Sequence, residues 1–503
     1  MSGSIVQGFD QIASQRPSAT ALRWRATRWS FLELRRAIAA VVKSLDRIGC
    51  EPGASVALLV RNSPQYVALY YGVLAAGRVA VPLNAQERSS VLLRQIEHCQ
   101  ARLLIGSTDH PEWPALSTAA AEAGVRLLAI SPREDDTALE QFERDLGAEG
   151  DDAELPVRNT ADLASIIYTS GTTGRPKGVM LSHGNLAANA NAIIRYLALT
   201  PADRGLCVLP FHFSYGNSVL HSHLLAGAEL VLEDNFAYPH LTVQRIQDEG
   251  ITGFPGVPST FALLLARCNL GDYQLGSLRY LTQAGGSMPR PLIERLHAEL
   301  PRVKLFIMYG QTEATARLTY LPPDKLESKM GSVGMAVPGI EIDVRFDGRS
   351  QPPGEIGEIC ARGPSIMLGY WNDERATAEV LRDGWLHTGD LGHRDDDGFF
   401  YIDGRSVDMI KVGAFRVSPQ EIEEVIAGIA GVEEVCAAGM TDELLGQAVK
   451  VTIVRREGAE LDERAIKAHC RQHLAAYKVP KQVEFVSVMP RTSSGKIQRF
   501  KLA

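Results

Sequence analysis

Short apolar segments of strand length alternate with longer helix-like segments through the first 160 residues of the chain. Residues 55–60 and 79–83 have the composition of buried strands, and the segment 63–76 between them has the length and composition of a helix. Two further strand-like segments, 103–106 and 126–130, continue the alternation. Strands that are separated by helices form parallel sheets with both faces covered, so this pattern predicts an α/β fold.

The 503-residue chain is too long for one hydrophobic core, and its pattern changes near Asp403. About 100 residues follow, which is enough for a separate domain. We therefore expect a large N-terminal domain of stacked subdomains with parallel-rich sheets (1–402), a hinge at Asp403, and a small, mobile α+β domain (404–503). The predicted elements of the small domain are strands at 435–440, 449–454 and 483–488 and a helix at 462–474.

Local patterns add four further expectations. Ser30 and Ser418 are each followed three residues later by a glutamate, which predicts capping boxes at two helix starts. Residues 134–162 are rich in charge and poor in apolar side chains, which predicts a surface connection. The arginine-rich segment 23–28 is interpreted as a solvated edge.

The composition argues against several classes of protein. The net charge is −7, so no basic face for DNA or RNA is predicted. The sequence contains no run of about 18 apolar residues, so no transmembrane segment is expected, and its first residues do not resemble a signal peptide. The seven cysteines are dispersed without a C-x-x-C pair, which is typical of reduced thiols in a cytoplasmic protein. The oligomeric state stays open.

The most specific chemical feature is a loop rich in glycine, serine and threonine. It extends from Tyr168 to Gly178 and directly follows an apolar, strand-like segment. Small residues let the backbone approach a ligand closely, and the amides, hydroxyls and lysine supply donors that suit a polyphosphate. The loop is not a Walker motif, because the G-x-x-x-x-G-K-[ST] pattern is absent. Its candidate ATP-binding residues are Thr169, Ser170, Gly171, Thr172, Thr173, Gly174 and Lys177.

Further motifs accompany this loop, in the order found in the adenylate-forming superfamily, which the chain resembles over nearly its whole length. That superfamily includes acyl- and aryl-CoA synthetases, adenylation domains of peptide synthetases and firefly-type luciferases. The resemblance implies an AMP-forming ligase that uses ATP and Mg²⁺ and passes the acyl group to CoA or to a separate phosphopantetheinyl carrier protein. The accompanying motifs are YGQTE at 309–313, GEIGEI at 354–359, HTGD at 387–390, GRSVDMIK at 404–411 and PRTSSGK at 490–496.

The resemblance also implies roles in adenylation, in which one anion attacks another and fixed cations are required. Lys496 would bridge the carboxylate and the α-phosphate, and Thr312 would donate to that phosphate. Glu313 would bind Mg²⁺, which prefers carboxylate and phosphate oxygens. His212 would lie beside the carboxylate, with a satisfied core histidine as the alternative. The nucleoside would be held by Gly285, Gly286, Ser287, Tyr309, Gly310, Asp390 and Arg405.

The acid pocket is expected to be apolar and to favour an aliphatic or aromatic acid. Ser214 stands where amino-acid adenylation domains carry the aspartate that holds the α-ammonium, so an α-amino acid is disfavoured. Arg317 could pair with a second carboxylate of the substrate, but a structural salt bridge is the favoured interpretation. The candidate pocket residues are Phe213, Ser214, Tyr215, Gly216, Phe254, Val257 and Phe261.

The resemblance implies that the second half-reaction uses a face of the small domain at Lys411, Gly413 and Ala414, after rotation about the hinge. Ala414 stands where the superfamily usually has glycine. Two alternatives stay open. One is an adenylating enzyme whose second step uses no thiol, such as a luciferase-like oxidase or a lactone-forming synthetase. The other is a catalytically inactive binding protein of the same fold, against which the intact motifs argue.

Overall fold

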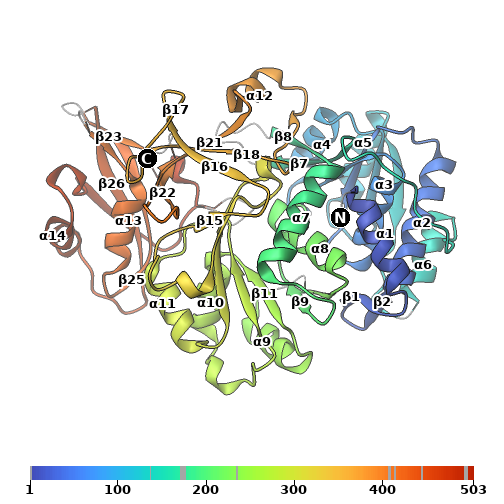
Figure 1. Cartoon of the computed structure of the whole chain (residues 1–503), viewed down its shortest axis with the longest axis horizontal. Helices are drawn as coiled ribbons and strands as arrows, with labels where there is room; N and C mark the ends of the chain where they lie inside the picture. Colours follow the sequence, from blue (N-terminus) through green and yellow to red (C-terminus); the bar gives the residue numbers. More distant parts are fainter. Residues whose placement is uncertain are drawn as a thin grey trace.

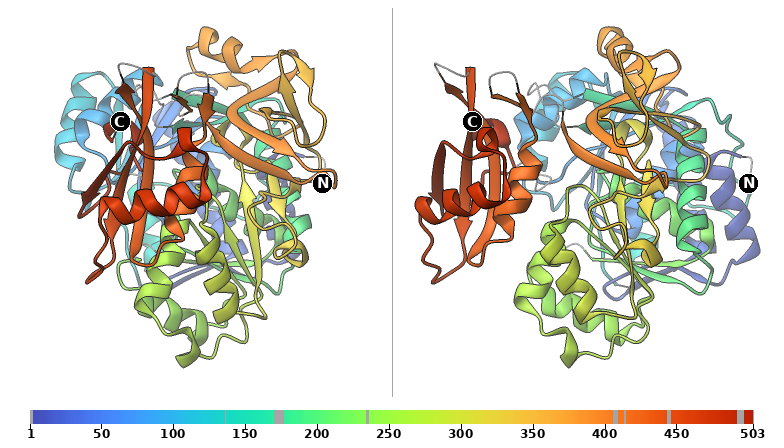
Figure 2. Two further views of the ribbon diagram at one scale, coloured as in Figure 1. Left: turned by 90° about the vertical axis from the view of Figure 1, so that its left-hand side faces the viewer. Right: turned by 60° about the vertical axis from the view of Figure 1, so that its left-hand side comes forward.

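A computed structural model describes residues 3–135, 137–169, 177–233, 236–405, 409–412, 415–442, 446–491 and 497–502. These residues form a large α/β body and a smaller C-terminal domain that lies against one side of it (Figures 1 and 2). Parallel strands dominate two sheets of the body, whereas the sheet of the C-terminal domain is mostly antiparallel. This architecture confirms the predicted fold class.

The first sheet of the body contains the strands that alternate with helices in the N-terminal part of the chain. Its strand order is β19-β8-β7-β4-β3-β5-β6, with parallel pairing from β7 to β6 and antiparallel pairing of β7 with β8. The strands are β3 (Ser55–Leu59), β4 (Val79–Pro82), β5 (Leu103–Ser107), β6 (Arg126–Ile130), β7 (Leu163–Thr169), β8 (Lys177–Ser182) and β19 (Gly369–Tyr370). The accompanying helices are α2 (Phe31–Ile48), α3 (Pro64–Ala75), α4 (Ser89–His98), α5 (Trp113–Glu122) and α6 (Ala138–Leu146).

The second sheet of the body has the order β15-β14-β13-β12-β11-β9-β10-β1-β2 and is parallel from β13 to β1. Its strands are β1 (Thr20–Trp24), β2 (Thr27–Ser30), β9 (Arg204–Cys207), β10 (Glu229–Leu232), β11 (Gly253–Gly256), β12 (Tyr280–Gln283), β13 (Lys304–Tyr309), β14 (Thr319–Leu321) and β15 (Met335–Ala336). The helices beside it are α1 (Ile5–Gln15), α7 (His183–Leu197), α8 (Ser214–Ala226), α9 (Pro239–Asp248), α10 (Pro258–Arg267) and α11 (Arg290–Glu299).

Two helices, α3 and α8, belong to the hydrophobic core that the two sheets share. Every residue of α3 is buried, as expected for a helix that is apolar on all faces. The Tyr71 hydroxyl and His221 Nδ1, 2.8 Å apart, join the two helices, and His223 Nε2 lies 3.1 Å from the Tyr280 hydroxyl. The α8 histidines therefore have tyrosine partners, which connect α8 to α3 and to β12.

A third sheet and the C-terminal domain complete the chain. The third sheet contains β16 (Glu341–Phe346), β17 (Arg349–Ser350), β18 (Gly357–Arg362), β20 (Leu381–Arg382), β21 (Trp385–Arg394) and β22 (Phe400–Arg405), with α12 (Glu374–Val380) beside it. The C-terminal domain contains β23 (Ile410–Val412), β24 (Phe415–Val417), α13 (Pro419–Ala427), β25 (Val432–Asp442), β26 (Gly446–Arg455), α14 (Glu463–His473) and β27 (Gln482–Val486). It has its own apolar core, centred on β23, β26, α13 and α14.

Two of the local expectations concern helix starts and one concerns a loop. The Ser30 capping box is confirmed, because its hydroxyl accepts from the Glu33 amide at 3.2 Å and the Glu33 carboxylate accepts from the Ser30 amide at 2.7 Å. The Ser418 capping box is wrong, because this hydroxyl donates to the Asp403 carbonyl instead. Residues 134–162 are not a plain connection, because helix α6 forms there and buries Phe142 on the body.

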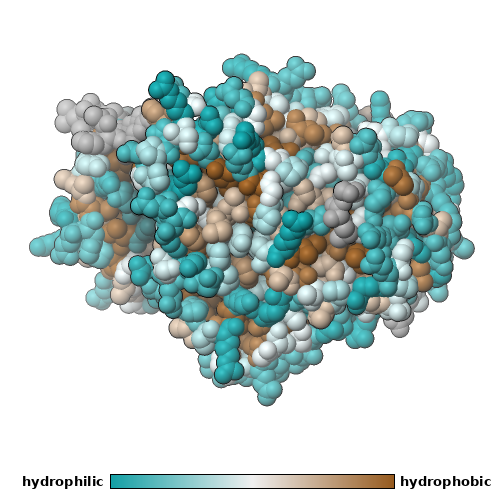
Figure 3. All heavy atoms as spheres, in the orientation of Figure 1, coloured by the Kyte–Doolittle hydropathy of each residue, from teal (hydrophilic) through white to brown (hydrophobic). Residues whose placement is uncertain are grey.

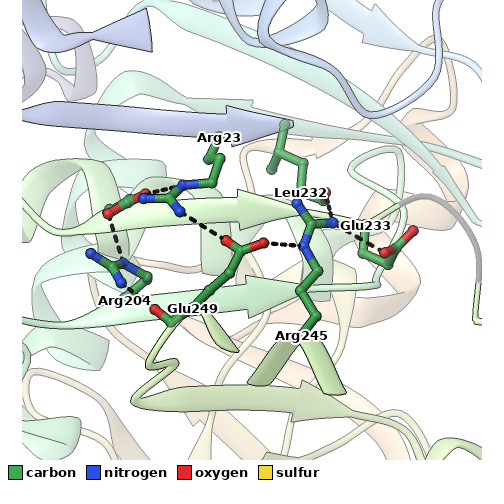
Figure 4. Close-up of polar contacts among 7 residues, drawn as sticks. Arg23, Arg204, Leu232, Glu233, Arg245 and Glu249 are labelled. Carbon is green, nitrogen blue, oxygen red and sulfur yellow. Dashed lines mark hydrogen bonds and ion pairs between the residues drawn. The ribbon is translucent and has the colours of Figure 1, made fainter. Parts of the chain in front are cut away.

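The arginine-rich segment is also more than a solvated edge. Arg23 on β1 pairs with Glu229 at 2.7 Å and with Glu249 at 3.2 Å, and Glu229 also binds Arg204 at 2.7 Å (Figure 4). Glu249 also binds Arg245 at 2.6 Å. This alternating network ties β1, β9, β10 and α9 together, so Arg23 has a structural role that sequence composition did not reveal.

The surface and the thiols match ordinary expectations for such a fold. None of the described helices is both long and apolar enough to cross a membrane. Polar side chains are spread over the face shown in Figure 3, with apolar ones interspersed. All seven cysteines are free thiols, in line with the scattered spacing seen in the sequence.

Candidate active site

The predicted phosphate loop connects two antiparallel strands of the first sheet. Thr169 ends β7 and lies opposite Lys177, which begins β8, so the two residues that flank the loop are paired. Residues Ser170, Gly171, Thr172, Thr173 and Gly174 lie outside the described residues. The Lys177 ammonium is 4.7 Å from the centroid of the Tyr370 ring, a cation–π contact that directs the lysine toward β19.

Glu313 lies beside the same tyrosine. Its carboxylate accepts a hydrogen bond of 2.8 Å from the Tyr370 hydroxyl. Burial, and then the neighbouring Glu313 charge, raise the pKa of Tyr370, so the hydroxyl keeps its proton and acts as the donor. Tyr370 therefore links a lysine and a carboxylate at the mouth of the hairpin. The sequence analysis assigned no role to Tyr370.

Tyr309 and Asp390 form a second polar pair. The Tyr309 hydroxyl donates to the Asp390 carboxylate at 2.6 Å, and Asp390 is only 4% exposed. Arg405 lies opposite Asp390 in the register of β21 and β22, although the Arg405 side chain is not among the described atoms. Motifs about 80 residues apart in the chain are thus in direct contact.

Glu358 shapes the turn that leads to Asp390. Its carboxylate accepts from the Gly389 amide at 3.1 Å and lies 2.7 Å from His387 Nδ1. Gly389 has φ +74°, a left-handed conformation that favours glycine. Glu358 therefore acts as a positioning residue for the aspartate. Glu358 belongs to the GEIGEI motif, which could have marked it as a candidate site residue. The sequence did not show that Glu358 contacts the HTGD motif.

The start of α8 lies against the segment after β13. The Ser214 and Thr312 hydroxyl oxygens are 3.1 Å apart. The His212 ring centroid is 4.1 Å from that of Phe213, and His212 Nε2 is buried with no hydrogen-bond partner among the residues that the structure describes. Burial lowers the pKa of His212 to about 3, so the ring is neutral near pH 7. The structure therefore does not support the alternative of a satisfied core histidine.

Gly285, Gly286 and Ser287 form the turn after β12. Gly285 has φ +87°, and the Gly286 carbonyl accepts from the Gln283 side chain at 2.7 Å. The Ser287 hydroxyl accepts a 3.2 Å hydrogen bond from Gln420 of the C-terminal domain. This turn thus lies where the body meets the small domain.

A small cavity beside α8 is lined in part by Arg317. The Arg317 guanidinium is 4.1 Å from the centroid of the Tyr215 ring. Within the described ranges Arg317 forms no salt bridge, so the favoured sequence interpretation of this residue is wrong. The cavity is lined by Ile193, Tyr196, Leu197, Ser218, Val219, Ser222, His223, Pro255, Tyr280, Thr282, Met308 and Arg317.

Two predicted pocket residues lie on the other side of the second sheet. Phe254 and Phe261 pack with α9, α10 and α11 and line a separate apolar cavity there. Pro255, next to Phe254 on β11, lines the Arg317 cavity. Side chains of a strand alternate between its two faces, so Phe254 points away from the side that Pro255 faces. The assignment of both phenylalanines to the acid pocket is therefore corrected.

The other candidates are placed as follows. A Cβ built on Gly216 would lie 2.3 Å from the Pro210 carbonyl, so only glycine fits at this turn of α8. Val257 lies beside Gly285, at 3.3 Å from a Cβ built there, and so near the predicted adenine slot. Gly413, Ala414 and Lys496 lie outside the described residues, as does the side chain of Lys411.

Comparisons with known proteins agree with this geometry. The sequence profile of the AMP-binding enzyme family matches residues 9–371, and that of the AMP-binding enzyme C-terminal domain matches residues 421–496. Feruloyl-CoA synthase of Amycolatopsis sp is 37% identical over 490 residues, which cover 96% of this chain and 95% of the relative. Indoleacetate–CoA ligase of Aromatoleum aromaticum is 33% identical, and the match covers 98% of this chain and 96% of the relative.

A solved structure gives the same result. The o-succinylbenzoate CoA synthetase of Bacillus subtilis, in complex with its acyl-adenylate intermediate, superposes with a TM-score of 0.88 at 27% identity, covering 98% of this chain and 97% of that one. The same synthetase was also solved with ATP and magnesium ion, with a TM-score of 0.87. The chain therefore belongs to the AMP-binding enzyme family and is an AMP-forming acid ligase that uses ATP and Mg²⁺.

Proposed function

We propose that this enzyme activates a carboxylic acid with an apolar, most simply aromatic, body and transfers the acyl group to the thiol of CoA. The observation that carries the proposal is that distant motifs meet in two polar pairs, Tyr309–Asp390 and Tyr370–Glu313. The acyl groups named in the relatives, feruloyl, indoleacetate and o-succinylbenzoate, are all aromatic and are all joined to CoA.

In the first half-reaction, a carboxylate oxygen attacks the α-phosphorus of ATP, and the bond to pyrophosphate breaks. We assign the polyphosphate to the hairpin tip between Thr169 and Lys177, where amides, hydroxyls and a lysine can neutralise it. Thr312 donates to the α-phosphate, and Lys496 bridges it to the carboxylate. The nucleoside lies over Gly285, Gly286, Ser287, Tyr309 and Gly310, with its ribose on Asp390 and Arg405.

The Mg²⁺ site is assigned to Glu313. A carboxylate has about four lone-pair positions, and the Tyr370 hydroxyl occupies one of them. The remaining positions would suit a hard cation such as Mg²⁺. Mg²⁺ held there would neutralise charge on the leaving pyrophosphate, and the hydrogen bond from Tyr370 would orient the carboxylate.

His212 borders the acid at the start of α8. Because its ring is neutral near pH 7, it adds no positive charge beside the carboxylate. Its buried Nε2 lacks a hydrogen-bond partner in the described part of the protein, which leaves it able to contact a bound molecule. We assign it a positioning role at the reacting carboxyl group.

In the second half-reaction, the thiolate attacks the acyl carbonyl carbon, and AMP leaves with its phosphate. We assign this step to the Lys411, Gly413 and Ala414 face of the C-terminal domain, after rotation about Asp403. CoA is the proposed acceptor because the relatives are CoA enzymes, and a separate carrier protein is the competing acceptor. AMP release measured with CoA, with pantetheine and without thiol distinguishes thiol transfer from a step that uses no thiol.

An ATP–pyrophosphate exchange assay with a panel of acids tests the substrate class. We expect exchange with aryl or aliphatic acids and none with α-amino acids. An α-ammonium in this cavity would lie near the Arg317 cation and would lack a carboxylate partner among the described lining residues. Strong exchange with a free α-amino acid, above every simple acid tested, would contradict the assignment.

A further inference from the structure

Three potential metal ligands of different kinds meet on the third sheet, next to the turn that leads to Asp390. They are the Glu358 carboxylate and the Cys360 thiol on β18, and the His387 imidazole on β21. One ligand atom from each residue lies within 4.8 Å of the other two. In the part of the chain that the structure describes, no other set of three His, Cys, Asp or Glu side chains forms such a group.

The strand register explains why these side chains meet. Glu358 and Cys360 are two residues apart on β18, so their side chains point to the same face of the sheet. Cys360 lies directly opposite His387 on the antiparallel strand β21, and side chains that lie opposite each other in such a pair are neighbours. The group therefore depends on strand pairing, because 27 positions separate Cys360 from His387 in the chain.

The distances between the ligand atoms are close to those of a tetrahedral zinc site. Cys360 Sγ is 3.4 Å from His387 Nδ1, and His387 Nδ1 is 2.7 Å from Glu358 Oε2. Bonds of about 2.3 Å from zinc to sulfur and about 2.1 Å to nitrogen or oxygen separate tetrahedral ligand atoms by about 3.4–3.6 Å. The sulfur and the nitrogen already have this separation. The carboxylate oxygen would have to move away from the nitrogen by about 0.7 Å to reach it.

The ligand set favours a transition metal over Mg²⁺. Thiolate and imidazole ligands select Zn²⁺ and similar ions, whereas Mg²⁺ prefers oxygen ligands. Thiolate and carboxylate together would neutralise the two charges of Zn²⁺, and water would take the fourth position. Burial, and then the Glu358 charge, raise the pKa of the Cys360 thiol to about 12, so binding releases the thiol proton to solvent as the metal–sulfur bond forms.

A metal ion can reach this group from the surface. Cys360 is buried, but the side chains of His387 and Glu358 are 13% and 26% exposed. The half-exposed Arg382 lies 3.7 Å from the same Glu358 oxygen that faces His387. An ion pair at such a distance and exposure contributes little free energy, so a metal ion would displace it readily.

The Glu358 carboxylate also supports the turn before Asp390. Its Oε1 accepts from the Gly389 amide at 3.1 Å, while its Oε2 faces His387. Asp390 follows directly in the chain, and its carboxylate accepts from the Tyr309 hydroxyl at 2.6 Å. A metal ion that draws the carboxylate toward itself would weaken the hydrogen bond to Gly389 and so displace Asp390, the residue that we assign to the ribose of ATP.

We propose that Glu358, Cys360 and His387 form a binding site for Zn²⁺ or a similar transition-metal ion, and that a bound ion weakens the binding of ATP. The site is regulatory, because none of its three ligands is among the residues assigned to ATP, to Mg²⁺ or to the acid. The inference goes beyond the proposed function and does not depend on which acid or which thiol the enzyme uses.

Metal titrations of the untagged, metal-free protein test the site. Calorimetry with Zn²⁺ alone should show one ion per chain that depends on Cys360, and Co²⁺ should give the near-ultraviolet charge-transfer band of a thiolate ligand. Cys360→Ala should abolish this band and weaken Zn²⁺ binding by about 100-fold or more, since even an outer-shell partner contributes about 10–100-fold. Cys470→Ala, which removes another buried thiol, is the matched control and should bind both ions as the wild type does.

The effect on ATP is measured by calorimetry in excess Mg²⁺, with and without one equivalent of Zn²⁺. In the wild type and in Cys470→Ala, Zn²⁺ should lower the ATP affinity by about tenfold, the scale of one hydrogen bond to a charged group. In Cys360→Ala, Zn²⁺ should have no such effect. The ATP affinity of Cys360→Ala without Zn²⁺ should equal that of the wild type, which shows that this variant is folded. Binding of Zn²⁺ by ATP itself affects all three proteins equally.

The outcomes are distinct. A Co²⁺ band and a Zn²⁺-dependent loss of ATP affinity that both disappear in Cys360→Ala support the proposal. Absence of Zn²⁺ binding, or Zn²⁺ binding that Cys360→Ala leaves unchanged, overturns the site. Binding that requires Cys360 but leaves the ATP affinity unchanged overturns the regulatory role. None of these measurements uses an acid, so the proposed function is decided separately by the exchange assay.

Discussion

At the scale of single residues, the site consists of short polar contacts between distant motifs. Tyr309 binds Asp390, Tyr370 binds Glu313, and Ser214 contacts Thr312. Each contact orients a group that we assign to ATP or to Mg²⁺. Substitutions that remove one contact should therefore change a defined kinetic constant and leave folding intact.

Tyr309→Phe removes the hydroxyl that donates to Asp390 at 2.6 Å. A hydrogen bond to a charged group contributes about 1.5 kcal/mol or more, so we expect the KM for ATP to rise about tenfold. The KM for the acid should change much less. The exchange assay at varied ATP, with calorimetric ATP binding, measures both. Tyr273→Phe, which alters a tyrosine of another region, is the control, and an unchanged ATP KM in Tyr309→Phe would contradict the role.

Lys496→Ala should lower adenylation by on the order of 10²-fold or more, because the lysine is assigned to charge that develops in the transition state. Transfer from preformed acyl-adenylate should be largely retained. Single-turnover measurements of each half-reaction test this expectation. Lys467→Ala removes the same charge from α14 and serves as the control. Adenylation within about threefold of wild type would show that Lys496 has another role.

At the scale of elements, the packing of α2 on α3 depends on one glycine. A Cβ built on Gly72 of α3 would lie 2.4 Å from the Val41 Cβ of α2. The two helices approach so closely because this position has no side chain. Helix propensity alone favours alanine over glycine by about 1 kcal/mol. At position 72, however, the close contact with Val41 favours glycine.

Gly72→Ala should therefore destabilise the protein, by about 1–3 kcal/mol as for other overpacked cores. Thermal or urea unfolding of the large body measures the change. Gly276→Ala is the matched control, because a Cβ at Gly276 meets no atom within 4 Å. A higher unfolding temperature for Gly72→Ala would mean that the helices separate readily and that propensity dominates.

At the scale of the whole molecule, we propose that the C-terminal domain takes a different position in each half-reaction. Asp403 lies between the body and that domain: its carboxylate is 2.8 Å from His393 Nδ1 on β21, and its carbonyl accepts from Ser418. The Ser418 hydroxyl, expected to cap a helix, instead contacts the proposed hinge. The Ser287–Gln420 hydrogen bond is a further contact between the two parts.

Asp403→Pro should restrict φ at the hinge and favour one domain position. Adenylation and thiol transfer should then fall by unequal factors, which single-turnover assays of the two steps would reveal. Asp403→Asn, which keeps the backbone free, is the conservative control. Equal losses in both steps would indicate general misfolding and not a trapped domain.

Local sequence patterns were enough to predict the parallel sheet, several motifs of the site and one helix cap. The alternation of apolar and amphipathic segments predicts the parallel sheet, because the periods of strands and helices are local properties. The motifs that contain Thr312, Glu313 and Asp390 are contiguous in sequence, so they could be recognised without a structure. The Ser30 cap is likewise confirmed, since all its partners lie within four residues.

The tertiary structure decided the features that depend on which surfaces meet. Period-two alternation predicts that Phe254 and Pro255 face opposite sides of a sheet, but only the packed layers show which side borders the Arg317 cavity. Composition predicts that a buried arginine needs a partner, but only the fold shows that Arg317 has no carboxylate within the described ranges. Local sequence sets the conformation of a segment, whereas its neighbours are set by free energy summed over the whole core.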